Sequence, residues 1–578
     1  MDLLGRTYKK NRVPENIDYI VIGSGIGGLW LAACLAHFGL SCLVLEQHYI
    51  AGGFQHTFRR GDYEFVPGLH YIANLALCRP LYDMVADNSM HIKYNRAGQS
   101  VLADKGLAYS HDLRIGNMPI MHVGEGKAQV RAELVKHFPE ETEAIDNFLA
   151  VMEKVKWQAG QFMTFKIFPP WLQFIMSQLF CSSYIKYAGM TTEEALSVLT
   201  TDGRLKTVLS AFGGDLGESL AEGSFAMQAA VLGHVMEGCY YPQGGPPVLA
   251  RGLIGPIRAA GGDVLVRACV QEVILDNGTA VGVRLANGDE IRGNKGVVSD
   301  AGMGATLDLL PTTSATGTPL EPLRRAVQQH SGGISHAFLF VGLNASAEEL
   351  GLRSSSFYYI PCNTSEDMNA SAIQDFYRDT LLDPTVEDVS AGIVFVSAKD
   401  PAYSARTMPG KATAVVFSEA HVEDFLPLLE APPPSAAGSA PTTAGPAYQE
   451  AKALVARKLR RALLANFPHL EPHIAVCEAA TPLTVQRYAG RAASLGLRHT
   501  PARMTDPALR PACAAVPGLY FTGQDVAFAG WAGAMSGALI TAQLLLGYGP
   551  LDLARGRTLL RELGAGEVEA TLRERAAA

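Results

Sequence analysis

A glycine-rich hexapeptide near the N-terminus has the composition and spacing of a phosphate-binding loop. It consists of Gly23, Ser24, Gly25, Ile26, Gly27 and Gly28, which is the pattern G-x-G-x-x-G. In such a loop the first glycine allows a tight turn, the second lets the backbone approach a diphosphate, and the third lets a helix pack on a strand. Unpaired N–H groups at the start of the following helix also attract phosphate. The hexapeptide therefore predicts that the protein binds a dinucleotide cofactor.

The residues around this loop predict the elements that would position it. Residues 19–22 form a short apolar run that is typical of a buried parallel strand, and residues 29–38 are a helix candidate. A second apolar run, 41–45, ends at Glu46, eighteen residues after Gly28. A carboxylate at that spacing accepts hydrogen bonds from the ribose hydroxyls of a dinucleotide. Strand, loop, helix, strand and acid therefore occur in the order of a Rossmann-like unit.

Two further segments that contain glycine follow this unit, QHYIAGG at 47–53 and FVPGLHY at 65–71. A glycine pair directly after a ribose-binding acid lets the backbone lie close to a ligand. The sequence E-Q-H-x-x-A-G-G followed by F-x-x-G-x-H-Y resembles the opening of the retinol saturase branch of the phytoene desaturase and carotenoid isomerase superfamily. Members of this superfamily are flavoproteins with the two-domain FAD fold that is also found in amine oxidases.

Later motifs extend the resemblance over nearly the full chain. Residues 240–245, YYPQGG, match the Y-P-x-G-G element of the superfamily. Residues 518–525, GLYFTGQD, combine a strand, a glycine turn and an acid, and residues 530–538, GWAGAMSGA, begin a helix of small residues. Several motifs in the family's order are far more specific than any one of them.

The resemblance implies that FAD is the cofactor and assigns roles to residues from both ends of the chain. Asp525 would meet the ribityl or phosphate part of FAD, and the strand backbone near Val270 would meet the adenine. The helix that begins near Gly530 would face the flavin ring with its N-terminus. The cofactor-binding residues that we expect are Gly23, Ser24, Gly25, Ile26, Gly27, Gly28, Glu46, Gln47, Gly52, Gly53, Gly68, His70, Val270, Gly523, Asp525, Trp531, Ala532, Gly533 and Ala534.

We predict an α/β fold: an FAD-binding Rossmann-like domain of the two-dinucleotide-binding-domain flavoprotein type, as in amine oxidases and phytoene desaturases, with an inserted mixed α+β substrate domain. One stretch of the inserted segment 305–510 is rich in Pro, Ala, Gly and Ser and cannot form a packed core. The predicted segments are 15–75, 236–304 and 511–550 for the FAD-binding domain, 76–235 and 305–510 for the substrate domain, 551–578 for a C-terminal helical tail, 335–342, 391–396 and 412–418 for strands of the substrate domain, 431–447 for a flexible surface loop, and 449–466 for an amphipathic helix.

The first insertion contains a strongly apolar stretch at 165–187. After Pro169 and Pro170, the sequence WLQFIMSQLF places aromatic and aliphatic residues around most of a helix, and Lys166 and Lys186 flank it. This helix is too short to span a bilayer. We therefore predict an interfacial helix that lies in the surface of a membrane. The same pattern also fits a buried lid over the substrate cavity.

The resemblance implies that the flavin carries the redox step, while the protein binds the substrate, orients it and excludes water. A proton donor beside the flavin would complement hydride delivery to an alkene carbon. The ionisable residues inside the family motifs are Tyr241, His70 and His56, which we take as catalytic candidates. The alternative for each is that it only packs or hydrogen-bonds around the cofactor. We expect no metal site.

The leading hypothesis is an FAD-dependent oxidoreductase that acts on a C=C bond of a hydrophobic polyene lipid, by hydride or electron exchange at flavin N5. The lipid would be a retinoid, a carotenoid or another isoprenoid. One alternative is a carotenoid cis–trans isomerase or desaturase that uses the same FAD site. Another is a lipid-binding flavoprotein without catalysis. The motifs around FAD do not separate these functions, because the flavin reaction can proceed in either direction.

The composition of the chain limits the kinds of molecule that the protein can bind. The net charge of −8 argues against nucleic acid. Residues 1–16 are polar and lack the apolar core of a signal peptide, so we expect an intracellular protein, peripheral on a membrane, with the endoplasmic reticulum and a plastid as candidate addresses. A second G-x-G-x-x-G after a strand is missing from the sequence, so we expect electrons to be exchanged with a partner or a quinone-like molecule. The identity of that electron donor or acceptor and the oligomeric state stay open.

Overall fold

The computed structural model describes residues 4–98, 109–211, 217–311, 320–361, 380–406, 409–430, 445–491 and 493–549, together with 552 and 559–564. Of the predicted loop 431–447, residues 431–444 lie outside the described residues. Of the predicted C-terminal tail 551–578, only 552 and 559–564 are described. No helix in these ranges is both long enough and apolar enough to cross a membrane.

The first layer of the fold is a six-stranded sheet in which all neighbouring strands run parallel. Every residue of the four central strands is buried, which explains why these runs are apolar almost throughout. The edge strand β1 was not predicted, because a strand of two residues leaves no recognisable sequence pattern. It precedes residue 15, where the predicted FAD-binding domain begins. The strand order is β1 (Arg6–Thr7), β11 (Asp263–Val266), β3 (Cys42–Glu46), β2 (Tyr19–Ile22), β15 (Gly296–Ser299) and β21 (Leu519–Phe521).

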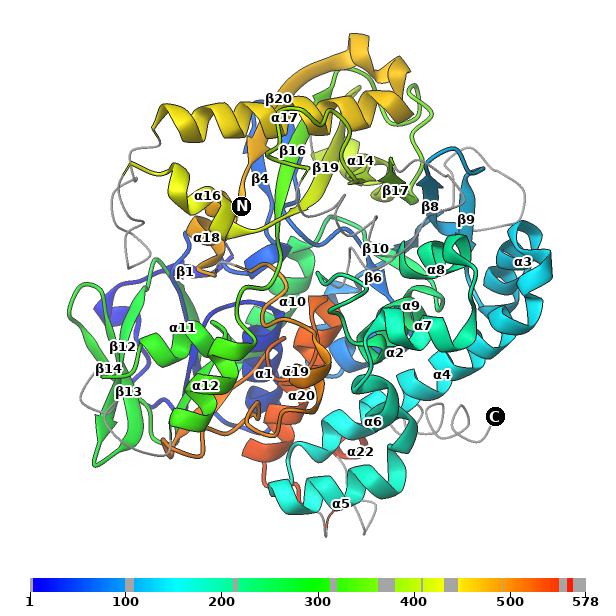
Figure 1. Ribbon diagram of the computed structural model, residues 1–578. Coiled ribbons are helices and arrows are strands. Elements are labelled where there is room, and N and C mark those ends of the chain that lie inside the picture. Colours follow the sequence, from blue (N-terminus) through cyan, green and yellow to red (C-terminus); the bar gives the residue numbers. More distant parts are fainter. Residues whose placement is uncertain are drawn as a thin grey trace.

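Helix α1 (Ile26–His37) lies between α10 (Pro247–Ala259) and α20 (Gly530–Leu545) on this sheet (Figure 1). A helix that is apolar on all sides must be buried on all sides. Accordingly, every residue of α1 before His37 is buried. Trp30 in its middle is fully buried and donates its indole N–H to the carbonyl of Leu81 at 2.9 Å.

A small antiparallel sheet follows the parallel one and joins β12 (Val270–Asp276), β13 (Thr279–Leu285) and β14 (Glu290–Arg292). Asn277 and Gly278, at the turn between the first two strands, have φ angles of 48° and 80°. Positive φ at both positions is what an Asn-Gly hairpin turn requires.

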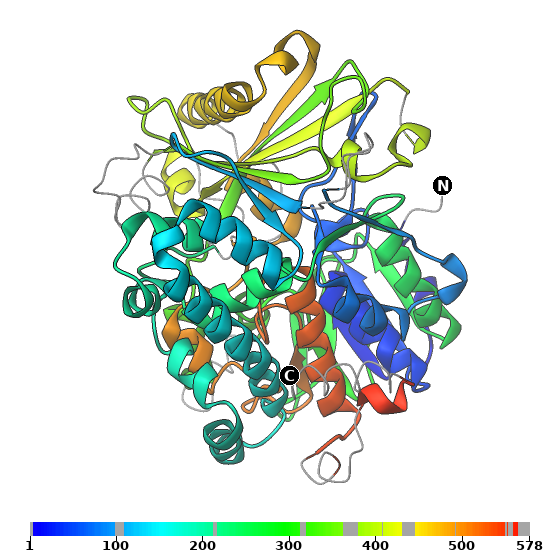
Figure 2. The same ribbon diagram turned by 90° about the vertical axis from the view of Figure 1, so that its right-hand side faces the viewer.

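The second layer is a seven-stranded mixed sheet that both insertions build together. Its outer face packs on α17 (Pro446–Asn466), which runs along the top of the molecule in Figure 1 and covers the sheet in Figure 2. The predicted strand 391–396 ends at Val394, because a helical turn, α14 (Val396–Lys399), begins there. The strand order is β20 (Ile474–Ala480), β16 (Ser335–Leu343), β19 (Ala412–Ala420), β18 (Ala391–Val394), β17 (Ser356–Ile360), β8 (Tyr109–Ile115) and β9 (Met121–Gly124).

A helical lobe and several short elements complete the fold. The lobe comprises α3 (Lys127–His137), α4 (Thr142–Phe165), α5 (Pro170–Phe180), α6 (Ser182–Ala188), α7 (Thr192–Leu199), α8 (Gly203–Ser210) and α9 (Phe225–Val235). The other strands are β6 (Ile72–Ala73), β10 (Cys239–Pro242) and β7 (Tyr94–Arg96) in one sheet, and β4 (Phe58–Arg60) and β5 (Tyr63–Phe65) in another. The other helices are α2 (Leu75–Asp83), α11 (Met303–Asp308), α12 (Glu321–Gln329), α15 (Tyr403–Arg406), α16 (Val422–Phe425), α18 (Pro482–Ala489), α19 (Pro501–Thr505) and α22 (Leu559–Glu562).

The two tryptophans Trp30 and Trp171 give a matched test of this packing. Trp30→Ala removes a fully buried ring between helices and should lower the free energy of unfolding by about 3–5 kcal/mol. Trp171 is 65% exposed, so Trp171→Ala should change it by less than about 0.5 kcal/mol. Urea denaturation followed by circular dichroism measures both. Equal losses in the two variants would contradict the assigned burial.

Candidate active site

A cavity of about 2840 Å³ lies between the parallel sheet and the seven-stranded sheet. A site for one small ligand measures roughly 300–1,000 Å³, so this cavity has room for a dinucleotide and a second molecule. We call one part the glycine end, which is lined by residues 23–27, 46–48, 267–271 and 529–534. We call the other part the aromatic end, which is lined by His70, His336, Phe338, Phe340, Ser356, Tyr358, Val394 and Phe417.

At the glycine end the hexapeptide connects β2 to α1, as the sequence predicts. Gly23 has a φ of +94°. Gly25 is the N-cap of α1, so the first N–H groups of the helix point toward the glycine end of the cavity. A Cβ at Gly28 would collide with the carbonyl of Gly23. Gly28 itself does not line the cavity, and its role is to let α1 pack on the loop.

Glu46 ends β3 and lines the cavity beside the hexapeptide. Its Oε2 accepts hydrogen bonds from the backbone N–H of Ser24 at 3.0 Å and from the Ser24 hydroxyl at 2.5 Å. Its Oε1 accepts from the backbone N–H of His48 at 2.8 Å. These bonds fix the carboxylate at the edge of the sheet where the carboxyl ends of β2 and β3 meet.

Asp300 is a residue that the sequence analysis missed. It follows β15, lines the cavity and is buried against the hexapeptide, so that a Cβ at Gly25 would lie 2.5 Å from its carboxylate. Burial raises the pKa of this carboxyl group to about 6, against the effect of nearby Arg491. A signal was present, because carboxyl ends of parallel strands meet at one edge of a sheet and Asp300 ends such a strand.

The second loop of the glycine end comes from the other end of the chain. Gly523 packs on the hexapeptide: a Cβ at Gly27 would lie 2.7 Å from the Cα of Gly523. Neither Gly523 nor Asp525 lines the cavity. Asp525 instead accepts hydrogen bonds from the backbone N–H groups of Met303 at 2.8 Å and Leu497 at 3.2 Å, so its carboxylate fixes neighbouring loops.

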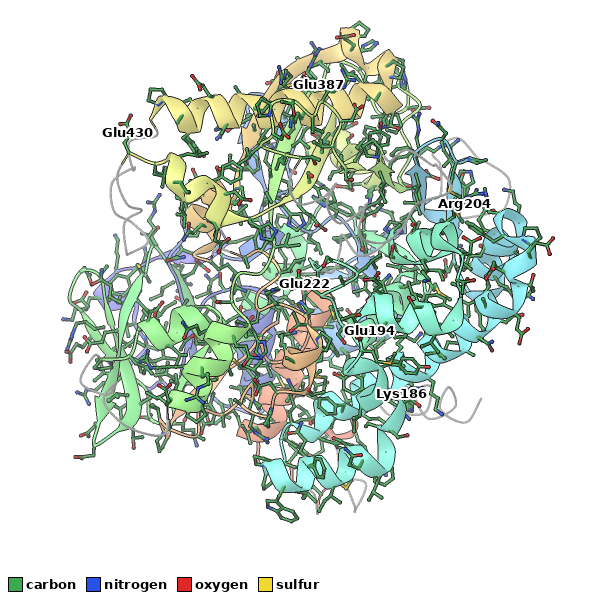
Figure 3. All side chains as sticks on the ribbon, in the orientation of Figure 1. Lys186, Glu194, Arg204, Glu222, Glu387 and Glu430 are labelled. Carbon is green, nitrogen blue, oxygen red and sulfur yellow. The ribbon has the colours of Figure 1, made fainter. Side chains whose placement is uncertain are left out.

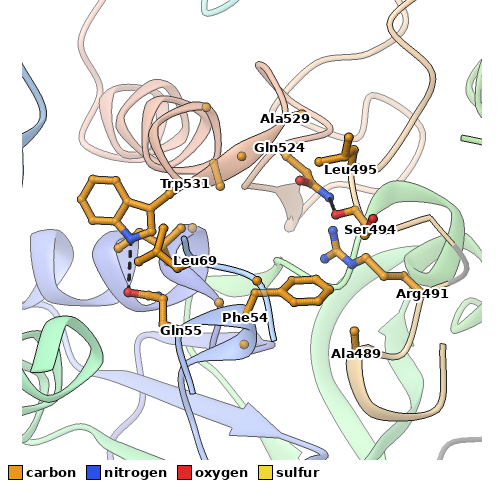
Figure 4. Close-up of a pocket in the computed structure, with 18 of the residues that line it drawn as sticks. Phe54, Gln55, Leu69, Ala489, Arg491, Ser494, Leu495, Gln524, Ala529 and Trp531 are labelled. Atoms are coloured by element: carbon orange, nitrogen blue, oxygen red, sulfur yellow. Dashed lines mark hydrogen bonds between the residues drawn. The ribbon is translucent and has the colours of Figure 1, made fainter. Parts of the chain in front are cut away.

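The start of α20 lines the cavity at the glycine end. Trp531 donates its indole N–H to Gln55 Oε1 at 3.2 Å, and Leu69 lies beside this pair (Figure 4). Across the site, Gln524 hydrogen-bonds the carbonyl of Ser494 at 3.4 Å (Figure 4). The predicted cofactor-binding residues that line the cavity are Gly23, Ser24, Gly25, Ile26, Gly27, Glu46, Gln47, Gly52, Gly53, Gly68, His70, Val270, Trp531, Ala532, Gly533 and Ala534.

The three catalytic candidates lie in different places. His70 lines the aromatic end, where its ring stacks on Phe417 with centroids 5.3 Å apart, and burial followed by the charge of Lys399 lowers its pKa to about 3. His56 lines the cavity near the hexapeptide, and burial lowers its pKa to about 4. Tyr241 is buried in a cluster with Phe65 and Phe340 and does not line the cavity, and burial raises the pKa of its hydroxyl well above the usual value.

His336 joins the aromatic end to the second loop and was also missed. It lies on β16, its Nδ1 is 2.7 Å from the Ser494 hydroxyl, and its ring meets Phe417 edge-on at 5.8 Å. Burial lowers its pKa to about 4, so His336 and His70 are both neutral at pH 7. The strand was predicted, but β16 is buried on both faces, so no alternation indicated which side chains would face the cavity.

Comparison with known proteins identifies the family. Residues 21–87 match the family described as NAD(P)-binding Rossmann-like domain. The all-trans-retinol 13,14-reductase of Danio rerio is 31% identical over 561 residues, which cover 94% of this chain and 88% of that protein. The chain belongs to the all-trans-retinol 13,14-reductase family. It is therefore an oxidoreductase. The resemblance to the retinol saturase branch that the sequence motifs indicated is confirmed.

More distant matches agree with the wider superfamily and the fold. The chloroplastic prolycopene isomerase of Daucus carota is 24% identical over 556 residues, which cover 91% of this chain and 80% of that protein. The solved structure of wild-type putrescine oxidase bound to putrescine superposes with a TM-score of 0.58 at 15% identity, covering 92% of this chain and 99% of that one. This structural likeness confirms the predicted α/β flavoprotein-type fold and carries no further conclusion about activity.

The contact between the two loops predicts a strong effect of one methyl group. Gly27→Ala would push its Cβ into Gly523 and Asp300, so the purified variant should contain little bound dinucleotide. Gly304→Ala is the control, because its Cβ would meet only Val327 at an ordinary 3.5 Å. Nucleotide released by denaturation and quantified per mole of protein measures both. Equal content in the two variants would contradict the assigned site.

Proposed function

We propose that the protein is an FAD-dependent oxidoreductase that reduces a C=C bond of a hydrophobic polyene lipid. The observation that carries this proposal is the continuity of the cavity, in which the phosphate-binding loop and a chamber of aromatic side chains share one space. The names of the reductases in this family support reduction as the direction. A hydrocarbon chain fits the aromatic end because its walls are mainly Phe, Tyr and Val side chains.

FAD is favoured as the dinucleotide because two loops, one from each end of the chain, meet at the glycine end. The N–H groups at the start of α1 would hold the diphosphate, and Glu46 would accept from the ribose. The N-terminus of α20, with Trp531 to Ala534 on the cavity wall, would face the flavin ring. When bound, FAD supplies hydride exchange at N5.

The chain's own side chains would then orient the lipid and exclude water. Phe417 packs against both His70 and His336, so the aromatic end is closed by stacked rings on the side of the sheet. Both histidines are neutral at pH 7, so neither places a charge beside a polyene. A wall of aromatic rings and neutral histidines suits an apolar substrate, because burial of a charge without a partner is costly.

The proposal is tested with the purified holoprotein, photoreduced in the absence of oxygen and mixed with all-trans-retinol. We expect the flavin to be reoxidised and mass spectrometry to find a product with two additional hydrogen atoms. A product of unchanged mass would contradict reduction and favour the isomerase. A product with fewer hydrogens would favour the desaturase, and bound retinol with unchanged reduced flavin would favour a non-catalytic lipid carrier.

We propose further that α5 contacts a membrane surface. Its polar residues Gln173 and Ser177 are buried, whereas Trp171, Phe174 and Leu179 are 65%, 65% and 69% exposed. This is the reverse of an ordinary surface helix, in which apolar residues face the core. Figures 1 and 2 place α5 at the margin of the molecule opposite the seven-stranded sheet. The exposure of these side chains is unlike that of a buried lid.

The two lysines that flank α5 in the sequence differ in their exposure to solvent. Lys186 is exposed near the end of α6 (Figure 3). Lys166 is buried and donates to the carbonyl of Val526 at 2.8 Å, and burial lowers its pKa to about 7. Sequence position suggested a flanking cation, but the chain turns inward there. Apolar contact therefore contributes more to the proposed binding than charge does.

The cavity extends toward this helix. Gly160, Met163 and Thr164, in the last turns of α4 before α5, line it, as does Leu539 of α20. A lipid that enters from the proposed membrane side would therefore meet the cavity without crossing the parallel sheet.

Vesicle binding tests this part of the proposal. The triple change Trp171→Ser, Phe174→Ser and Leu179→Ser should abolish sedimentation with phosphatidylcholine vesicles, because it removes the exposed apolar face. Val198→Ser on α7, where the side chain is 70% exposed, is the control and should sediment like the wild type. Undiminished sedimentation of the triple variant would contradict membrane contact through α5.

A further inference from the structure

A buried histidine at the aromatic end carries an acceptor without a partner. His70 is 9% exposed and lines the cavity, and its Nε2 has no hydrogen-bond partner within the described residues. The ring does bond to the backbone of Val66, and this bond therefore uses Nδ1. A neutral imidazole has one N–H, which Nδ1 donates to the Val66 carbonyl. Nε2 is then a buried hydrogen-bond acceptor that the described residues leave unsatisfied.

A hydroxyl group is fixed next to the same residue. Lys399 is buried, and its Nζ donates to the backbone carbonyl of His70 at 3.0 Å and to the Ser356 hydroxyl oxygen at 2.9 Å. One ammonium group thus holds both residues in place. Because the Ser356 oxygen accepts from Lys399, its own proton is left for a second hydrogen bond. Ser356 also lines the cavity.

The surroundings of these two groups are apolar. Phe417 stacks on His70, and Phe338 and Tyr358 lie around Phe417 at centroid distances of 6.2 and 6.4 Å. An acceptor and a donor within an aromatic chamber match a ligand that is apolar except for one group that both donates and accepts. An alcohol has this property, whereas a hydrocarbon has neither capacity and an aldehyde cannot donate.

We propose that His70 and Ser356 form the binding site for the hydroxyl group of an uncharged lipid alcohol. The ligand O–H donates to His70 Nε2, and the ligand oxygen accepts from the Ser356 hydroxyl. This inference rests on the proposed function, since it takes the cavity to hold a polyene lipid. It assigns His70 an acceptor role toward the substrate in place of the proton-donor role that the sequence suggested.

The site adjoins the cofactor end of the cavity, which has a consequence for regiochemistry. His70 follows Leu69, which lies beside Trp531 at the start of α20 (Figure 4). On the other side His336 bonds Ser494, whose carbonyl is hydrogen-bonded by Gln524 of the second loop. A hydroxyl held here places the double bond nearest to it, rather than one far along the chain, toward the cofactor. The site therefore selects which double bond is reduced.

Equilibrium binding to the oxidised holoprotein tests the site without turnover. The probes are all-trans-retinol, its methyl ether and all-trans-retinoic acid, followed by fluorescence quenching. We expect the wild type to bind retinol about tenfold more tightly than the ether, the effect of one hydrogen bond. His70→Phe keeps a ring against Phe417 but removes the acceptor, so retinol and ether should bind equally. His234→Phe, at a neutral histidine on the α9 side of the cavity, should keep the preference.

Each outcome decides the assignment. A tenfold preference that persists in His70→Phe would overturn it, as would a wild type that binds ether and alcohol equally. Retinoic acid bound more tightly than retinol would also overturn it, because the site would then recognise an anion through Lys399. If His70→Phe loses its flavin, Ser356→Ala decides, because retinol and its ether both accept from Ser356: about tenfold weaker binding of both probes supports the site, and unchanged affinities overturn it. A wild type that prefers retinol but never reduces it supports the hydroxyl site and contradicts the proposed function alone.

Discussion

The structure depends on one contact that tolerates no side chain, the packing of the hexapeptide at Gly23–Gly28 against the loop at Gly523. The Cα of Gly523 lies 2.7 Å from where a Cβ of Gly27 would be, and the Asp300 carboxylate also lies against that position. The contact brings together segments about five hundred residues apart, each at the carboxyl end of a parallel strand. The chain between the two loops therefore leaves this edge of the sheet and returns to it. The two insertions lie in that part of the chain and close over one cavity.

Sequence reasoning succeeded where the determining interactions are local. The loop, its strand and its helix follow from spacing and from the buried character of consecutive residues, and β2, α1 and β3 occur as predicted. The strand at β16 was predicted for the same reason. A motif order along the chain also identified the family, because insertions do not change that order.

Sequence reasoning failed where tertiary packing decides the direction of a side chain. Asp525 sits in a cofactor motif, yet backbone N–H groups of neighbouring loops turn it away from the cavity. Lys166 was expected at a membrane surface but is buried on the carbonyl of Val526. His336 lies in a strand that is buried on both faces, so its sequence neighbours carried no information about which face meets the cavity. Tyr241 likewise belongs to a motif but is buried in a hydrophobic cluster and does not line the cavity.

We propose that one cavity holds a dinucleotide at the glycine end and a lipid alcohol at the aromatic end. The most direct test is a crystal structure of the holoprotein with all-trans-retinol bound. We expect a diphosphate on the hexapeptide and the retinol oxygen at about 2.7–3.2 Å from a ring nitrogen or hydroxyl of the His70 and Ser356 pair. Retinol bound with its hydrocarbon ring at His70, or bound outside the aromatic end, would contradict it.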